Sequence, residues 1–315
     1  MKYKIILFVL LFLIIVIASF AIYQFIHSIN LSIKYPPPGN LIDVGGYKLH
    51  FDCIGNGKIP VVFESGSGMF SLEWTEVFKL FDKYKNDFQF CRYDRAGLGW
   101  SDSSPDDYSI INEVEALHAG LNKLGINKNI IFVSHSYGGF ITTLYVSKYS
   151  ESVRGIVYAD SNTVHFFESN PGIVKSNVYI SYFIKFLASS GLLRPAGIHL
   201  NRSLIPDDDR DRFLDLSLSN KSMVSIAESG INFSDSLESL RKVTLLENIP
   251  IIIISRGQFN KDFNTQKLED DWREGHRILA SSHGNSKLII SVKSDHMIPY
   301  KDPEIIIQSI LSLTQ

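Results

Sequence analysis

After residue 40 the chain alternates short apolar runs with stretches of helical periodicity, and this alternation constrains the fold more than any other feature. Continuous apolar runs indicate strands buried on both faces, and the amphipathic stretches between them are typical of the helices that cover such strands. The pattern predicts an α/β fold with a mostly parallel eight-stranded sheet and helices on both faces. The expected strands are residues 41–44, 48–53, 59–63, 88–93, 130–133, 153–159, 250–254 and 288–292.

The alternation is interrupted after the sixth expected strand. Residues 161–248 carry mostly helical patterns broken by three prolines, and the apolar strand pattern then resumes. We expect this segment to form a helical cap over the carboxyl edge of the sheet. The core domain would then consist of residues 41–160 and 249–315.

The N-terminus is strongly apolar. Lys2 and Lys4 precede it, and no Asp, Glu, Lys or Arg occurs between Lys4 and Lys34. Because about 20 apolar residues span a bilayer core as a helix, we expect residues 1–28 to form a transmembrane helix, followed by a Pro-rich linker at 29–40.

The flanking lysines favour a cytoplasmic N-terminus, which places the domain outside the cytoplasm. The alternative is a signal segment with Ser19-Phe20-Ala21 as the cleavage site, which would give a secreted protein. The length of the apolar stretch favours the uncleaved anchor.

Composition narrows the classes of function. The formal net charge is -2 and 20% of residues are charged, and we find no basic stripe of the kind that nucleic-acid binding needs. No nucleic-acid partner is expected. The sequence has no clustered metal ligands and no phosphate-binding loop, so no metal or organic cofactor is expected.

The strand expected at 130–133 runs into Ser-His-Ser-Tyr-Gly-Gly at 134–139, and a helix follows. A strand, a small-x-Ser-x-Gly turn and a helix form a nucleophile elbow, in which a tight turn lifts the serine hydroxyl above the sheet. The residues two positions away, Ser134 and Gly138, are small enough for that turn. The N-terminus of the helix favours developing negative charge. Ser136 is therefore the predicted nucleophile.

With this elbow the chain resembles the α/β-hydrolase fold superfamily, in the group that includes serine esterases and lipases. The resemblance covers about residues 41–313. Its landmarks occur in the family's order, at residues 63–68, 93–101, 134–139 and 294–296. The Asp94-Arg95 pair in the second landmark is interpreted as structural.

The resemblance implies His296 as the general base, because it lies between the last expected strand and the last expected helix, where the family's catalytic histidine sits. Among the other histidines, His135 is expected to pack against its surroundings. His276 and His283 are expected to be solvated.

The acid has two candidates. Family sequences commonly carry it after the strand that here is 250–254, but this chain has Ser255-Arg256-Gly257 there, and Asp262 stands further on. A second known placement is the end of the preceding strand, where Asp160 directly follows Ala159. Asp160 is the favoured acid and Asp262 the alternative.

The resemblance also implies an oxyanion hole and a pair of neighbouring cysteines. The backbone N–H groups of Tyr137 and Ser67 are the expected oxyanion donors. Cys53 and Cys91 fall on strands that are neighbours in the family's strand order. A disulfide between them and two buried free thiols both stay open.

The function implied is hydrolysis of a carboxylic ester or related acyl substrate through an acyl-serine intermediate, with a Ser-His-Asp triad. Epoxide hydrolases and dehalogenases need a carboxylate nucleophile, so Ser136 argues against both. A proline-type aminopeptidase and a non-catalytic membrane-tethered binding protein are the alternatives. Aromatic residues of the cap are expected to line a pocket for a small hydrophobic acyl or ester substrate: Phe166, Phe167, Tyr179, Tyr182, Phe183 and Phe186.

Overall fold

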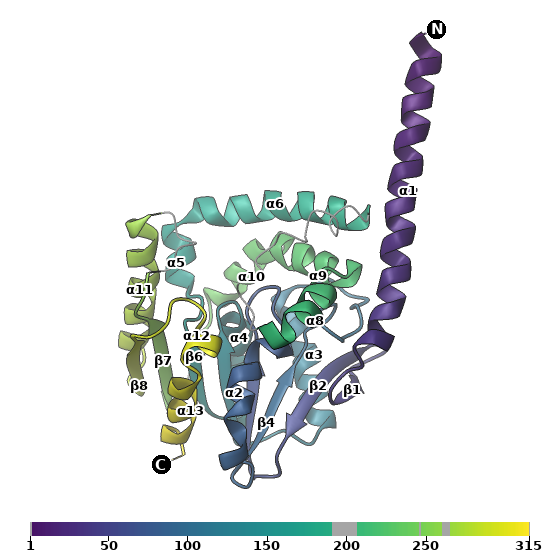
Figure 1. Ribbon diagram of the computed structural model, residues 1–315. Coiled ribbons are helices and arrows are strands. Elements are labelled where there is room, and N and C mark those ends of the chain that lie inside the picture. The colour runs from purple at the N-terminus through teal and green to yellow at the C-terminus, as the bar shows by residue number, and fades with distance from the viewer. Residues whose placement is uncertain (1, 191–206, 246, 260–264, 315) are drawn as a thin grey trace.

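The apolar runs form the centre of a sheet. Strands β5 (Ile130–His135) and β7 (Ile251–Arg256) are buried along their whole length, as expected for apolar and β-branched residues covered on both faces. The computed structural model describes residues 2–190, 207–245, 247–259 and 265–314 (Figure 1). The alternative acid Asp262 lies outside these residues.

The sheet has eight strands in the order β1-β2-β4-β3-β5-β6-β7-β8. Strand β2 pairs antiparallel with both β1 and β4, and the remaining neighbours pair parallel. The predicted mostly parallel eight-stranded sheet is confirmed. The other strands are β1 (Asn40–Asp43), β2 (Lys48–Ile54), β3 (Ile59–Glu64), β4 (Phe88–Tyr93), β6 (Val153–Ala159) and β8 (Ser286–Ser291).

Helices cover both faces of the sheet. Alternate residues of β5 point to opposite sides, so Ile130 and Phe132 belong to one apolar cluster and Ile131 and Val133 to another. The first cluster includes residues of α3 (Ile110–Lys123), α4 (Gly138–Tyr149) and α11 (Gln266–Ser281). The second includes residues of α2 (Thr75–Lys79) and α13 (Pro303–Ser312). The predicted layers are therefore confirmed (Figure 1).

A disulfide joins Cys53 and Cys91, which settles the choice between a disulfide and free thiols. The two residues lie opposite each other on the antiparallel pair β2 and β4, with their Cα atoms 4.0 Å apart. The bond closes a loop of 38 residues, which in the chain-entropy model stabilises the fold by about 4 kcal/mol.

The described residues between β6 and β7 form helices above the carboxyl ends of the strands (Figure 1). These are α5 (Val164–Ser169), α6 (Pro171–Ser189), α8 (Asp207–Ser217), α9 (Asn220–Ile231) and α10 (Phe233–Leu240). The boundaries of a separate cap at 161 and 248 stay a prediction.

The aromatic residues of this region do not lie as the sequence suggests. Phe166 and Phe167 are buried, but the four aromatic residues of α6 are between 58% and 76% exposed. The expectation that they line a pocket is wrong, because α6 packs on α9 through the opposite side, where Ser181 and Ala188 are buried. The four exposed residues are Tyr179, Tyr182, Phe183 and Phe186.

The N-terminal segment forms a single helix, α1 (Lys2–Lys34). Its length and composition suffice to cross a membrane, either as an anchor or as a signal segment. The helix continues to Lys34, so the predicted linker at 29–40 is shorter than expected, because the first helix-breaking residue is Pro36.

Candidate active site

The turn between β5 and α4 has the backbone of a nucleophile elbow. Ser136 has a φ of 51°, a conformation that non-glycine residues adopt rarely. A Cβ atom at Gly138 would lie 2.5 Å from the backbone oxygen of Glu64, and one at Gly139 would lie 2.5 Å from Cβ of Ser161. The turn therefore requires the absence of side chains at these two positions. It presents Ser136 at the N-terminus of α4.

The structure brings together Ser136, His296 and Asp160. Ser136 Oγ lies 3.1 Å from His296 Nε2, and His296 Nδ1 lies 2.7 Å from Asp160 Oδ2. A carboxylate only accepts hydrogen bonds, so Nδ1 donates and the neutral ring leaves Nε2 free to accept from the Ser136 hydroxyl. The three residues come from the β5–α4 turn, the end of β6 and the loop after β8.

Asp160 is fully buried and is held by several donors. Its Oδ1 accepts hydrogen bonds from the backbone N–H of Arg256 at 3.0 Å and from Trp272 Nε1 at 3.1 Å. Arg256 Nη1 lies 2.8 Å from Oδ2. Burial alone would raise the pKa of Asp160, but the Arg256 guanidinium and then His296 hold it well below its usual range. The carboxylate is therefore ionised.

Arg256 is itself part of a buried chain of charges. Its Nη2 lies 2.9 Å from Glu269 Oε2, and Glu269 also accepts from Arg273 Nε at 2.7 Å. In the sequence this segment is notable only because it lacks a carboxylate. The signal that could have identified Arg256 is that a cation stands where the family commonly carries the acid.

His135 is buried beside the base. Its Nδ1 lies 2.6 Å from Glu73 Oε1, and its Nε2 donates to the backbone carbonyl of His296 at 2.7 Å. Burial lowers the pKa of His135, but the Glu73 carboxylate more than offsets this, so the pKa is raised above its ordinary value. The expected packing role therefore extends to an ion pair and to support of the His296 loop.

The pKa of His296 is lowered from its ordinary value. Burial is the main cause, and the neighbouring His135 ring, 4.6 Å away between centroids, adds to it, while Asp160 acts in the opposite direction. A neutral imidazole in this place is able to accept a proton at neutral pH.

Two histidines predicted to be solvated are buried, so that prediction is wrong. His276 is 0% exposed, with Nδ1 2.9 Å from Ser255 Oγ and Nε2 donating to the carbonyl of Ser161 at 2.8 Å. It lies one helical turn after the buried Trp272, on the face of α11 that packs against the sheet. His283 is also buried, just beyond the same helix.

The loop after β3 lies against Ser136. A Cβ atom at Gly66 would be only 3.4 Å from Cβ of Ser136. Arg95 fixes this loop by donating to the carbonyls of Ser65 at 2.7 Å and Gly66 at 2.6 Å, in agreement with the structural role expected of it. Ser67 follows in the same loop and is exposed. The other expected oxyanion donor, Tyr137, directly precedes α4.

Among the described residues, no group of three or more His, Cys, Asp or Glu side chains is arranged to hold a metal ion. Next to the nucleophile, Asn162 Oδ1 lies 3.5 Å from Ser136 Oγ. Asn162 also lines a cavity of about 320 Å³ between α4, α5, α10 and α11. Its walls include Phe140, Val164, Leu240 and Leu279 and are largely apolar.

Comparisons with known proteins agree with this architecture. The chain is 25% identical over 254 residues to the uncharacterized protein YqjL of Bacillus subtilis, which covers 80% of this chain and 82% of that protein. Among solved structures, an epoxide hydrolase from Bacillus megaterium superposes with a TM-score of 0.65 at 20% identity, over 87% of this chain and 99% of that one. A thermophilic esterase from Thermogutta terrifontis superposes with a TM-score of 0.61 at 17% identity, over 86% and 95%.

These two likenesses show a shared fold. The family described as alpha/beta hydrolase fold matches residues 59–313, which include Ser136, Asp160 and His296. The chain therefore belongs to the α/β-hydrolase fold family.

Proposed function

We propose that this protein is a serine hydrolase that cleaves a carboxylic ester or a related acyl substrate through an acyl-Ser136 intermediate. The observation that carries the proposal is the unbroken hydrogen-bonded series from Ser136 through His296 to the buried, ionised Asp160. This arrangement supplies a nucleophile, a base and an acid that holds the base in one tautomer.

In the first half-reaction Ser136 Oγ attacks the substrate carbonyl carbon while its proton passes to His296 Nε2. The imidazolium that forms is stabilised by Asp160, 2.7 Å away on the other ring nitrogen. When the tetrahedral intermediate collapses, Nε2 returns the proton to the leaving alcohol and the acyl group stays on Ser136. In the second half-reaction water replaces Ser136 as the nucleophile, and the same proton transfers release the carboxylic acid.

The negative charge on the tetrahedral oxygen needs donors. We assign them to the backbone N–H groups of Tyr137 and Ser67, because Tyr137 directly precedes α4 and the loop that contains Ser67 lies against Ser136. Donors fixed by α4 and by the Arg95 contacts need little reorganisation during the reaction. Each such donor is worth about 3 kcal/mol of barrier.

A hydrophobic acyl group is the substrate class we favour. The largely apolar cavity supports this choice. Asn162 lines the cavity and its Oδ1 lies 3.5 Å from Ser136 Oγ, so the cavity is next to the proposed nucleophile. The helix α1 is proposed to anchor the chain in a membrane with the catalytic domain outside the cytoplasm. The lysines at its N-terminus and the Cys53–Cys91 disulfide both fit that topology.

The test is covalent labelling with a fluorophosphonate probe, followed by hydrolysis of p-nitrophenyl esters of increasing chain length. Labelling and hydrolysis should be lost in Ser136→Ala and retained in Ser281→Ala, a serine exposed at the end of α11. Labelling that persists in Ser136→Ala would exclude this nucleophile. An unaltered chain that takes no label and cleaves no ester would favour a non-catalytic binding protein.

A further inference from the structure

The lower half of α1 is fixed to the domain. Gln24 is buried and donates from Nε2 to the carbonyl of Leu218 at 2.9 Å. Ten residues later, Lys34 Nζ pairs with Asp215 Oδ2 at 2.9 Å. Just past the helix, the Trp100 indole N–H donates to the carbonyl of Tyr35 at 2.8 Å. These contacts, spread over three turns, set the direction in which the rest of α1 leaves the domain (Figure 1).

The upper half of α1 projects freely. The described side chains from Tyr3 to Phe20 are exposed or half-buried, and almost all are apolar. At 1.5 Å per residue this part is about 27 Å long, which is close to the roughly 30 Å thickness of a bilayer's hydrocarbon core. The membrane surface nearest the domain would therefore lie at about the level of Ala21.

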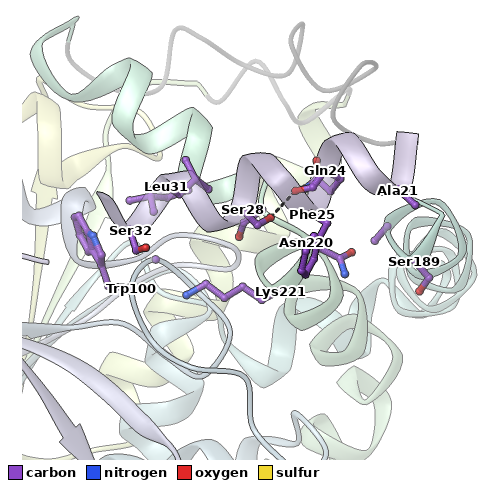
Figure 2. Close-up of a pocket in the computed structure, with 14 residues that line it drawn as sticks. Ala21, Gln24, Phe25, Ser28, Leu31, Ser32, Trp100, Ser189, Asn220 and Lys221 are labelled. Carbon is purple, nitrogen blue, oxygen red and sulfur yellow. Dashed lines mark hydrogen bonds between the residues drawn. The ribbon is translucent and has the colours of Figure 1, made fainter. Parts of the chain in front are cut away.

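The end of α6 lies at this same level. Both helices line one cavity of about 480 Å³, to which α1 contributes Ala21, Gln24 and Phe25 and α6 contributes Ala188 and Ser189. Figure 2 shows Ala21 next to the end of α6 that carries Ser189. From this point α6 runs across the direction of α1 along the outer side of the domain (Figure 1). A membrane crossed by α1 would thus lie along α6.

The outward side of α6 is apolar and aromatic. Tyr179, Phe183 and Phe186 are spaced four and three residues apart, which places them on one face of the helix, and each is more than 60% exposed. The opposite face packs closely on α9, since a Cβ atom at Gly230 would lie 2.0 Å from Ser181 Oγ. Ile180 and Tyr182 are also exposed and flank the aromatic face.

We propose that α6 lies in the lipid–water interface of the membrane that α1 crosses, as a second contact between the domain and the bilayer. Tyrosine is enriched in this interfacial region, and a helix lying in the interface buries an apolar face that is often rich in phenylalanine. Lipid is the partner we assign to this apolar face, because α6 ends at the level where α1 would enter the membrane. Resting on the proposed function, it further implies that the enzyme acts on ester lipids held in the bilayer.

The membrane contact is tested by measuring how deeply position 183 lies in the bilayer. The full-length Phe183→Cys variant is labelled with a nitroxide and reconstituted in vesicles of phosphatidylcholine and phosphatidylglycerol. The two native cysteines are joined in a disulfide and do not compete for the label. Ala21→Cys gives the reference, and Ile111→Cys, at an exposed apolar position on α3, gives the control.

The expected result is that the ratio of collisions with oxygen to collisions with a water-soluble nickel complex at position 183 resembles that at 21. It should exceed the ratio at 111 by roughly threefold or more, since interfacial helices sit about 5–10 Å deep. A ratio at 183 equal to that at 111 would overturn the proposal. A ratio that changes with the amount of protein per vesicle would assign the face to a second copy of the chain and also overturn it.

The second test measures substrate access. In Phe183→Ser/Phe186→Ser we expect hydrolysis of p-nitrophenyl palmitate held in vesicles to fall roughly tenfold, because much apolar contact with lipid is lost. Hydrolysis of the water-soluble acetate should not change. The control is Leu41→Ser/Ile111→Ser, at exposed apolar sites away from α6. Equal losses on both esters would overturn the access claim. If the unaltered chain cleaves neither ester, the proposed function fails while the depth measurement still decides the position of α6.

Discussion

His135 Nε2 donates a hydrogen bond to the backbone carbonyl of His296 at 2.7 Å, so the residue next to the proposed nucleophile holds the loop of the proposed base. The other ring nitrogen of His135 pairs with the buried Glu73, which also accepts from the backbone N–H of Gly66 at 2.8 Å. The His135–Glu73 pair thus connects the elbow, the His296 loop and the loop that contains Ser67.

Replacing the proposed acid should abolish most activity. In Asp160→Asn we expect kcat on a p-nitrophenyl ester to fall by about 10⁴, because an amide at this position stabilises the wrong tautomer of His296. KM should change little. Asp262→Asn is made in parallel, and steady-state kinetics compares the two. Activity lost in Asp262→Asn but retained in Asp160→Asn would reverse the assignment.

Arg256 is expected to act through Asp160 and His296. In Arg256→Gln the pKa of Asp160 should rise, since its main stabilising charge is lost. The pKa of His296 should rise as well, because the nearby guanidinium lowers it. The acid limb of kcat/KM should therefore move to higher pH.

Arg256→Lys should restore part of this shift, which a purely structural role would not predict. The buried Asp160 and Glu269 would lose their shared partner in Arg256→Gln, and we expect a cost of about 3–5 kcal/mol in the free energy of unfolding. Chemical denaturation measures this cost. An unshifted pH profile in a folded Arg256→Gln protein would contradict the assigned role.

The pH dependence of the unaltered protein follows from the lowered pKa of His296. The reaction needs the neutral imidazole, so activity is present above that pKa and is lost as the pH falls through it. Because the pKa lies below its ordinary 6.5, the acid limb of kcat/KM should have its midpoint below pH 6.5. In His135→Gln, which removes the neighbouring positive charge, the midpoint should rise. A midpoint above 6.5 in the unaltered protein would be inconsistent with this site.

The disulfide predicts a redox dependence of stability. Reduction should lower the free energy of unfolding by about 4 kcal/mol, since it releases a loop of 38 residues in the unfolded chain. Thermal unfolding with and without reductant measures this. The control is Cys53→Ala/Cys91→Ala, whose unfolding should not respond to reductant. A similar response in the control would show that the effect comes from elsewhere.

Much of the fold was predictable because its signals are local. The run Ile251–Ile254 is apolar on both faces, and a sheet covered on both sides is the arrangement that buries it. The positions of Ser136 and His296 follow from a tight turn and a strand end, and the structure places their side chains 3.1 Å apart. Asp160 was one of two candidates on sequence grounds, and the other lies outside the described residues.

What the sequence did not reveal depends on contacts between distant segments. Arg256 meets Asp160 across 96 residues, and only the adjacency of β6 and β7 brings them together. The burial of His276 depends on which face of α11 turns toward the sheet. The aromatic face of α6 has a periodicity that suits a protein core and a lipid surface equally well, so sequence alone assigned it to the wrong surroundings.

At Ala21 the helix α1 changes from a part that projects freely to a part that is docked on the domain. Its exposed apolar stretch therefore lies before Ala21 and its docking contacts lie after it. The cleavage site of the alternative signal segment, Ser19-Phe20-Ala21, falls at this change, and the contacts of Gln24, Lys34 and Tyr35 all lie beyond it. A cut there would remove the hydrophobic stem and leave every one of these contacts in place. The apolar stretch and the docking contacts thus occupy successive halves of one helix, and the same folded domain is compatible with a tethered or a released form.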